Sequence, residues 1–128
     1  MRMNVIHTDN APAAVGPYSQ AIEANGMLYL SGQIAIQPRE GKILATEIEG
    51  QAEQCCQNIE AVLAEAGTDT NAAVKTTCFL KNMADFQKFN AVYARHFPGK
   101  PARSCVAVAD LPAGALCEIE VIAIAPKK

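Results

Sequence analysis

The chain has 128 residues, 50% of them hydrophobic and 19% charged, and its formal net charge is -2 at pH 7. This length is typical of one domain around one core, so we expect a single domain over residues 1–128. The apolar content excludes a disordered chain, and no apolar run approaches the ~18 residues of a membrane-spanning helix. The acidic balance and the lack of a basic run disfavour nucleic acid as a partner.

The N-terminal third of the sequence is predicted to form a β-hairpin. Strand-like segments at 19–24 and 27–33 flank Asn25-Gly26, a dipeptide that favours the positive φ angles of a tight turn. Strand alternation in the second segment places Ser31 on the face opposite two leucines. We expect a short strand before this hairpin and a loop containing Pro and Gly after it, at 4–8 and 37–42.

A long helix is predicted next. Thr46 and Glu49 have the spacing of a capping box, and apolar residues then recur at helical spacing until Gly67. These signals predict a helix over 47–66. The segment that follows, 74–80, is rich in Val, Thr, Cys and Phe and is predicted to be a strand.

A second helix is predicted to begin at Asp85 and to end before Pro98-Gly99, with His96 near its C-terminal dipole. One stripe of this helix is aromatic: Phe86, Phe89, Tyr93 and Phe97. The last predicted elements are a strand, a turn and a long strand, at 102–109, 111–114 and 115–125. The order is therefore β-β-α-β-α-β-β, which predicts an α+β fold, a mixed sheet with two helices packed on one face.

The two faces of the last predicted strand differ in composition. One face is small and wholly apolar, as expected under helices: Cys117, Ile119, Val121, Ala123 and Ala125. The other mixes carboxylates with large aliphatic residues: Leu116, Glu118, Glu120, Ile122 and Ile124. Neither solvent nor a dry core suits the second set, but a surface that packs on another subunit and lines a cleft suits it.

The strand at 102–109 extends this argument. If Val106 and the valine two residues later face the helices, Arg103 and Cys105 lie on the face that carries Glu118. Ser31 falls on that face as well. The pattern therefore predicts one polar site on the outer side of the sheet.

Each of these side chains has a functional and a structural interpretation. Arg103 is either an anchor for a ligand carboxylate or one half of an ion pair with Glu118 or Glu120. Glu118 is either a general base that orients a water or an interface carboxylate. Cys105 is a weak candidate for a thiolate nucleophile because neither histidine is placed to act as its base.

Two further positions are candidates for the site. Gly32 ends a strand and permits the close approach of a ligand to the backbone. Tyr18 follows Gly16-Pro17 in a loop, where it either caps a pocket or packs as an ordinary loop residue.

The cysteines and the N-terminus indicate a reduced, cytoplasmic protein. The odd number of cysteines, two of them neighbours in a predicted helix, does not fit a secreted disulfide scaffold: Cys55, Cys56, Cys78, Cys105 and Cys117. The first nine residues carry one arginine and no long apolar run, so we expect no targeting signal. No CxxC motif occurs and the two histidines are far apart, so we expect no metal site.

The sequence resembles the Rid family of reactive-intermediate deaminases, also called the YjgF family, over nearly its whole length. The segments that carry the resemblance are 16–21 (GPYSQA), 30–34 (LSGQI), 75–77 (KTT), 83–86 (MADF), 101–106 (PARSCV), 111–112 (LP), 114–116 (GAL) and 118–120 (EIE). The resemblance implies a chorismate-mutase-like fold and a homotrimer with ligand clefts between subunits. It also implies hydrolysis of 2-imino acids and their enamine tautomers, such as 2-aminoacrylate, to 2-keto acids and ammonia. Pyridoxal-phosphate dehydratases release these intermediates, and the reaction uses no cofactor or metal.

The resemblance also implies roles for individual residues. Arg103 matches the arginine that binds the substrate carboxylate, Cys105 the position whose backbone amide meets the same carboxylate, and Glu118 the carboxylate that orients the attacking water. Three further residues match positions that line the pocket: Tyr18, Ser31 and Asn90. The match implies that Tyr18 reaches the pocket of a neighbouring subunit.

Alternatives from other classes stay open. The same cleft in a trimer would suit a regulatory module that binds a keto acid or an amino acid without turnover. Some relatives are described as translation inhibitors or ribonucleases, and the acidic composition counts against that activity here.

Overall fold

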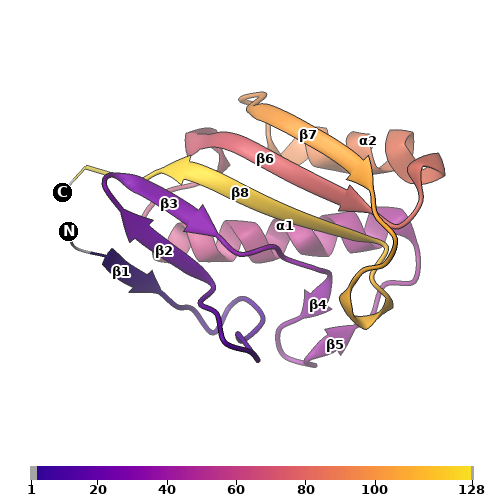
Figure 1. The fold of residues 1–128 in the computed structure, drawn as a ribbon, viewed down its shortest axis with the longest axis horizontal. Coiled ribbons are helices and arrows are strands. Elements are labelled where there is room, and N and C mark those ends of the chain that lie inside the picture. Colours follow the sequence, from indigo (N-terminus) through magenta and orange to yellow (C-terminus); the bar gives the residue numbers. More distant parts are fainter. Residues whose placement is uncertain (1–2, 128) are drawn as a thin grey trace.

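The computed structural model describes residues 3–127, which contain a six-stranded mixed sheet with two helices on one face (Figure 1). The spatial order of the strands is β1-β2-β3-β8-β6-β7, and only β6 and β7 pair in parallel. The sheet consists of β1 (Met3–Ile6), β2 (Ala21–Ala24), β3 (Met27–Leu30), β6 (Ala73–Leu80), β7 (Ala102–Ala107) and β8 (Cys117–Ile124). The helices are α1 (Ile48–Glu65) and α2 (Phe86–His96). The predicted α+β architecture is confirmed.

The N-terminal hairpin forms as predicted. Asn25 and Gly26 join β2 to β3 with φ angles of 52° and 77°, the left-handed values that a tight hairpin turn requires. The predicted short first strand is β1, which pairs with β2. The segment predicted as a loop at 37–42 instead lies within a small separate hairpin of β4 (Ile36–Gln37) and β5 (Lys42–Ile43).

The bounds predicted for α1 are confirmed to within one residue at each end, but the predicted capping box is wrong. Glu47 occupies the N-cap position, and no side chain caps the helix there. At the other end Gly67 has a φ of 87° and donates its N–H to Ala64, while the Thr68 N–H donates to Leu63. These two bonds form a Schellman motif, which explains why the helix stops where the glycine predicts.

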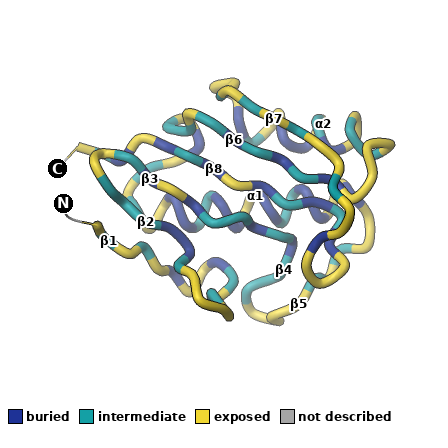
Figure 2. The backbone as a smooth tube through the Cα atoms, in the orientation of Figure 1, coloured by how far each residue is buried: buried dark blue, intermediate teal, exposed yellow. Residues whose placement is uncertain are grey.

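The core lies between the sheet and the helices, and burial alternates strictly along β8 (Figure 2). The β8 residues that face the helices are 0–1% exposed: Cys117, Ile119, Val121 and Ala123. The aromatic stripe of α2 is confirmed, with the rings of Phe89, Tyr93 and Phe97 stacked in sequence. The five cysteines carry free thiols, and all but Cys105 are buried.

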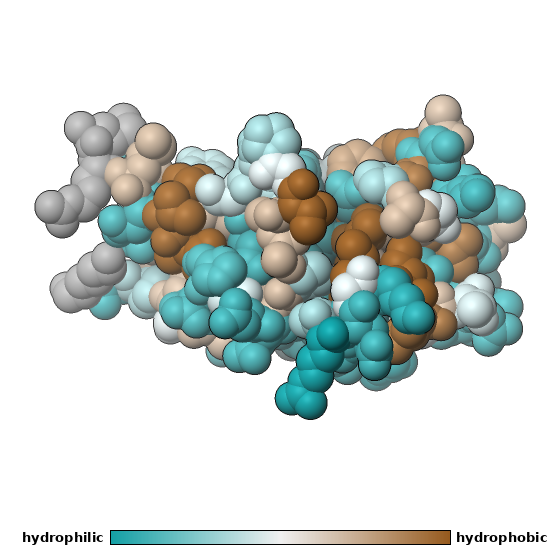
Figure 3. Space-filling view, turned by 90° about the horizontal axis from the view of Figure 1, so that it is seen from below, coloured by the Kyte–Doolittle hydropathy of each residue, from teal (hydrophilic) through white to brown (hydrophobic). Residues whose placement is uncertain are grey.

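The outer face of the sheet has no helix on it and keeps large apolar side chains at its surface. Tyr29 on β3, Val106 on β7 and Ile124 on β8 are each about half exposed. Seen from below the orientation of Figure 1, the surface alternates hydrophobic with hydrophilic patches (Figure 3). Within residues 3–127, neither helix combines the length and apolar character needed to cross a membrane.

Candidate active site

Arg103 lies on the helix-covered side of the sheet, so the prediction that it shares a face with Glu118 is wrong. Strand β7 pairs with β6 so that Arg103 is opposite Thr76, and Thr76 is in turn opposite Val121 of the covered face. Glu118 is opposite Phe79, one residue out of phase with this row. Cys105 follows Arg103 onto the covered side, opposite Cys78.

The prediction failed because β7 is an edge strand. The outer edge of β7 pairs with no other strand of the described chain, and Val106 is 47% exposed on the side of Glu118. An edge strand has no fully buried face, so its valines do not reveal which side the helices cover. The covered side of β7 instead receives the arginine, because α2 presents aromatic rings to its long side chain.

The guanidinium of Arg103 is held by neutral groups only. Its Nη1 donates a 2.7 Å hydrogen bond to Oδ1 of Asn90, and its Cζ lies 4.8 Å from the ring centroid of Tyr93 and 5.6 Å from that of Phe86. No carboxylate of residues 3–127 forms a salt bridge with it, so the ion pair with Glu118 that the sequence left open is absent. The positive charge is therefore available to an anionic ligand.

A hollow of about 310 Å³ lies between α2 and the start of β7. Its walls are rings and short apolar groups with two cations: Asn90, Tyr93, Ala94, Phe97, Pro98, Lys100, Pro101 and Arg103. A small organic anion is the ligand class that this combination of charge and apolar surface suits.

Cys105 is a poor nucleophile in this environment. Burial raises the pKa of its thiol, and the nearby Arg103 charge lowers it by less, so the net pKa is raised. A thiol with a raised pKa supplies little thiolate at neutral pH. The structure therefore disfavours covalent catalysis through Cys105.

Glu118 is a half-buried carboxylate on the outer face, and it lies directly over Gly32. A Cβ on Gly32 would overlap the Glu118 carboxyl group, with its Cδ only 2.8 Å away, so the missing side chain makes room for the carboxylate. Burial raises the pKa of Glu118, and the charge of Glu120 raises it further. A carboxyl group with a raised pKa is suited to accept and return a proton.

Ser31 directly follows β3 and is hydrogen-bonded to the segment that follows Tyr18 in the chain. The Ser31 hydroxyl donates a 2.6 Å hydrogen bond to the carbonyl of Ser19, and the Ser31 N–H donates to the carbonyl of Gln20. Tyr18 is 52% exposed in the adjoining loop. The Gln20 side chain is buried and bonds the backbone of Thr8, which fastens this loop to the sheet.

The predicted site residues thus form two separate groups within one chain. The arginine group is Arg103, Asn90 and Cys105, and the glutamate group is Glu118 and Gly32, with Ser31 next to Gly32 in the chain. Tyr18 lies in the loop that precedes β2. Strand β6 lies between β7 and β8, which places the two strands roughly 10 Å apart, and the two charged side chains leave opposite faces of the sheet. A single chain does not bring the guanidinium and the carboxylate together.

Sequence reasoning missed the residues that support Arg103. The predicted aromatic stripe contains both Phe86 and Tyr93, but its contact with the arginine follows only once the face of β7 is known. It also missed the role of Gln20, since a lone glutamine in a loop gives no local signal of burial.

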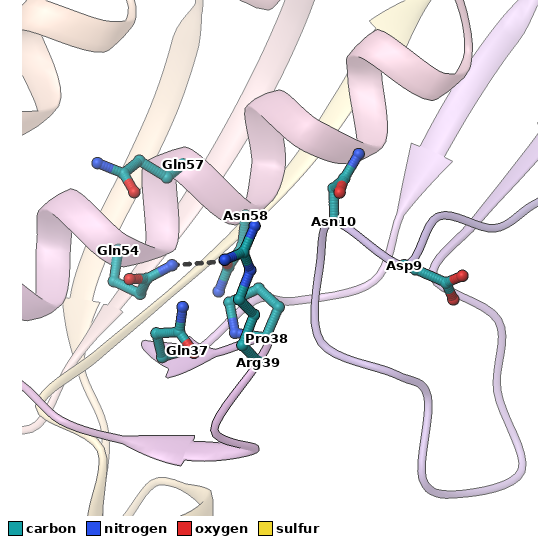
Figure 4. Close-up of a pocket in the computed structure, with 8 residues that line it drawn as sticks. All are labelled: Asp9, Asn10, Gln37, Pro38, Arg39, Gln54, Gln57 and Asn58. Carbon is teal, nitrogen blue, oxygen red and sulfur yellow. Dashed lines mark hydrogen bonds between the residues drawn. The ribbon is translucent and has the colours of Figure 1, made fainter.

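A second hollow, of about 290 Å³, contains none of the predicted site residues (Figure 4). Amide side chains from α1 and the segment around β4 dominate its walls. Gln54 donates to Oδ1 of Asn58, and Asn58 donates to the carbonyls of Ile34 and Ile36. These bonds tie the β4–β5 hairpin to α1, so Asn58 has a structural role here.

A family model described as Endoribonuclease L-PSP matches residues 8–125. The chain belongs to the Rid (YjgF, L-PSP) family. The resemblance that its motifs suggested is thereby confirmed, and the match includes every residue of the two groups.

Relatives of this Rid protein carry different functional names. It is 53% identical over 122 residues to the "Putative regulator AldR" of Lactococcus lactis, which covers 94% of this chain and 97% of the relative. It is 45% identical over 124 residues to "Reactive Intermediate Deaminase A, chloroplastic" of Arabidopsis thaliana, covering 96% of this chain and 66% of the relative. A solved structure of E. coli TdcF with bound serine is 37% identical, with a TM-score of 0.91 over 96% of this chain and 99% of that one. The family therefore includes reactive-intermediate deaminases alongside members with other names.

Proposed function

We propose that this Rid protein is an imine deaminase. Its substrates are 2-imino acids and their enamine tautomers, such as 2-aminoacrylate, that pyridoxal-phosphate dehydratases release, and its products are 2-keto acids and ammonia. The observation that carries the proposal is the guanidinium of Arg103, which neutral groups hold beside a hollow, and which forms no salt bridge with a carboxylate of residues 3–127. The serine bound to TdcF, itself an amino acid with a carboxylate, supports a ligand of this class.

The complete site is proposed to form between subunits of a homotrimer. Arg103 and Glu118 leave opposite faces of one sheet, so a site that contains both needs the arginine group of one subunit and the glutamate group of its neighbour. The open edge of β7 and the mixed outer face of the sheet provide surfaces for this contact. Obligate interfaces combine an apolar centre with polar groups in the same way.

The proposed chemistry follows from these two groups. Arg103 and the backbone amide of Cys105 bind the substrate carboxylate and hold the C=N carbon in place. Glu118 accepts a proton from a water as the water oxygen attacks that carbon, which gives a tetrahedral carbinolamine. The same proton is returned to the nitrogen. Glu118 then takes the hydroxyl proton of the carbinolamine as the C–N bond breaks, so that the C=O bond of the 2-keto acid forms and ammonia leaves and accepts that proton. Proton transfer of this kind contributes about 10²–10⁴-fold, so neither a metal nor a covalent intermediate is needed.

Substitution of the anchoring arginine tests the proposal. A dehydratase acting on threonine generates the imine in situ, and the release of ammonia and 2-keto acid is followed with and without the purified protein. Arg103→Ala is expected to lower kcat/KM by about 10²–10³-fold, since removing one partner of a charged pair costs about 2–5 kcal/mol. Arg95→Ala, an exposed arginine on α2, is the matched control and should turn over substrate like the wild type. Wild-type turnover by Arg103→Ala would refute the anchoring role.

The thiol has a test of its own. Cys105→Ala keeps the backbone amide and is expected to keep most of the activity. Complete inactivation with the fold intact would instead indicate a thiolate mechanism.

The interface has a separate test, because assembly is measured without substrate. Ile122→Lys places a charge on the outer face of β8, and Leu44→Lys places one on a more exposed apolar residue outside the sheet. Light scattering after size exclusion is expected to give a trimer mass for the wild type and for Leu44→Lys, and a lower mass for Ile122→Lys. A monomeric wild type at micromolar concentration would contradict a site shared between subunits.

A regulatory binding module is the second candidate. The name of AldR and the serine bound to TdcF favour it, because serine is a ligand without a C=N bond to hydrolyse. Binding of serine or a 2-keto acid with no acceleration of ammonia release would establish this alternative.

A further inference from the structure

We propose that Tyr93 is a positioning residue for Arg103, and that a buried hydroxyl pair with Thr76 fixes its ring. The inference rests on the proposed function only in taking a carboxylate as the ligand of Arg103. Tyr93 does not touch the reacting atoms in this account. Its ring sets where the guanidinium lies and leaves the charge of Arg103 without an anionic partner.

The contact with Arg103 is made by the face of the ring. The Cζ atom of Arg103 lies 4.8 Å from the Tyr93 centroid, within the range of a cation–π interaction and closer than its 5.6 Å approach to Phe86. Asn90 fixes the guanidinium from another side through its 2.7 Å hydrogen bond. An arginine side chain has many rotamers, and these contacts together hold it in one of them.

The ring itself has no freedom to move. Its hydroxyl lies 2.6 Å from Oγ1 of Thr76, which is 0% exposed, and Tyr93 is 8% exposed. The rings of Phe89 on α2 and of Phe97, which directly follows α2, stack on it with centroids 5.9 Å and 4.6 Å away. The hydroxyl pair fixes the ring at its far end, and the stack fixes its plane.

The sheet register brings the three side chains together. Thr76 of β6 is the direct partner of Arg103 on β7, so both leave the same face of the sheet under α2. Tyr93 on α2 therefore contacts the arginine with its ring and the neighbouring strand with its hydroxyl. Any displacement of α2 relative to β6 would move the guanidinium as well.

Neutral support has a chemical consequence. A carboxylate in place of Tyr93 would also orient the guanidinium, but it would compete with the ligand for the same N–H groups. An aromatic face and an amide oxygen hold the cation and leave its charge uncompensated. The arrangement therefore favours tight binding of a ligand carboxylate.

The test compares two substitutions in the same aromatic stack. Tyr93→Leu removes the ring under Arg103, and Phe89→Leu removes a buried ring of the same helix that makes no cation–π contact with the arginine. Calorimetry with 2-oxobutanoate measures binding. Tyr93→Leu is expected to raise the Kd by about tenfold, the equivalent of a largely desolvated cation–π contact. Phe89→Leu is expected to lose stability but to keep the wild-type Kd.

Two hydroxyl variants test the link to Thr76. Thr76→Val strands the Tyr93 hydroxyl in the core and is expected to weaken 2-oxobutanoate binding. Adding Tyr93→Phe to it removes the stranded group while keeping the ring, and binding is expected to recover. Because Tyr93→Phe keeps the core volume, this pair tests the proposal even if Tyr93→Leu does not fold.

Kinetics and spectroscopy separate positioning from general damage. Tyr93→Leu is expected to raise KM more than it lowers kcat. In the wild type, the ring current of Tyr93 should shift the Arg103 Hε resonance upfield, and this shift should vanish in Tyr93→Leu and persist in Tyr93→Phe.

The outcomes distinguish this inference from the proposed function. If Arg103→Ala binds 2-oxobutanoate like the wild type, the carboxylate anchor is wrong. If Arg103→Ala loses binding but Tyr93→Leu binds normally with an unchanged Arg103 resonance, the anchor stands and the positioning role is wrong. Equal weakening by Phe89→Leu and Tyr93→Leu would also overturn it, because the effect would then be general to the stack.

Discussion

The two faces of β8 differ in burial and in composition. Ile119 and Val121 on the covered face are at most 1% exposed, whereas on the outer face Ile124 is 55% exposed and Glu118, near the other end of the strand, is half-buried. The covered face is completed by the helices of its own chain. The outer face carries both apolar surface and a carboxylate whose pKa is raised, and nothing in residues 3–127 packs over it as the helices do over the other side. One face stabilises the fold, and the other is available for assembly and chemistry.

The largest expected effect comes from exchanging isoleucine for alanine on each face of that strand. Ile119→Ala should lower the free energy of unfolding by about 2–5 kcal/mol, because it leaves a cavity under α1. Ile124→Ala should change it by less than about 1 kcal/mol at protein concentrations low enough for the subunits to separate. Urea unfolding measures both. If the outer face is a subunit interface, the effect of Ile124→Ala is larger at high protein concentration and shrinks on dilution, and that of Ile119→Ala does not change. Equal losses at all concentrations would erase the distinction between the faces.

The second comparison is between the two glutamates on the outer face of β8, Glu118 and Glu120. Glu118→Gln removes the proposed base and is expected to lower kcat by about 10²-fold with little change in KM, since proton transfer contributes at least that much. Glu120→Gln, two residues along the same face and exposed, is the matched control and should keep kcat. Removal of the Glu120 charge would lower the pKa of Glu118, because that charge helps to raise the pKa. The lower limb of the pH–rate profile is therefore expected to move to lower pH. An unshifted profile would contradict the coupling.

The smallest expected effect concerns the covered side, where His96 joins the two helices. Its Nε2 lies 2.8 Å from Glu53 and its Nδ1 lies 2.9 Å from Glu60. Burial of the ring opposes its charge, but the hydrogen bonds to these carboxylates outweigh burial, so the pKa of His96 is raised. The bond to His96 in turn lowers the pKa of Glu53.

These shifts define a pH window for stability. The His96 contribution is complete below its unfolded pKa of 6.5 and is lost as pH rises through its higher folded pKa. The Glu53 contribution is complete above its unfolded pKa of 4.5 and is lost as pH falls through its lower folded pKa. The free energy of unfolding should therefore be highest between pH 4.5 and pH 6.5. His96→Gln should reduce this maximal free energy by about 1–2 kcal/mol. A His96→Gln profile parallel to that of the wild type from pH 4 to 9 would refute this role.

The sequence predicted those parts of the fold whose signals are local. Asn25-Gly26 specifies its turn through φ, Gly67 stops α1 through a Schellman motif, and β8 reports burial because both of its neighbours are strands. Prediction from the sequence failed for elements whose placement depends on residues far away in the chain. The face of β7 depends on the position of α2, and the β4–β5 hairpin depends on bonds from Asn58 on α1.

The candidate site shows the same limit. Alternation along β8 correctly placed Glu118 on the outer face. The family resemblance implied that Asn90 lines the pocket, and its hydrogen bond with Arg103 became apparent only from the structure. Whether Arg103 and Glu118 share a face was beyond the pattern, because an edge strand is half exposed on both sides. The separation of the two groups became apparent only from the strand register.

The empty position at Gly32 gives the protein an unusual evolutionary vulnerability. The atoms that a new methyl group would meet belong to the flexible end of Glu118 rather than to the backbone, so a single change to alanine would leave the architecture intact and turn the carboxylate aside. In the proposed mechanism, such a variant would still bind the substrate carboxylate through Arg103 but would hydrolyse the C=N bond slowly. One substitution at Gly32 would then separate turnover from binding alone.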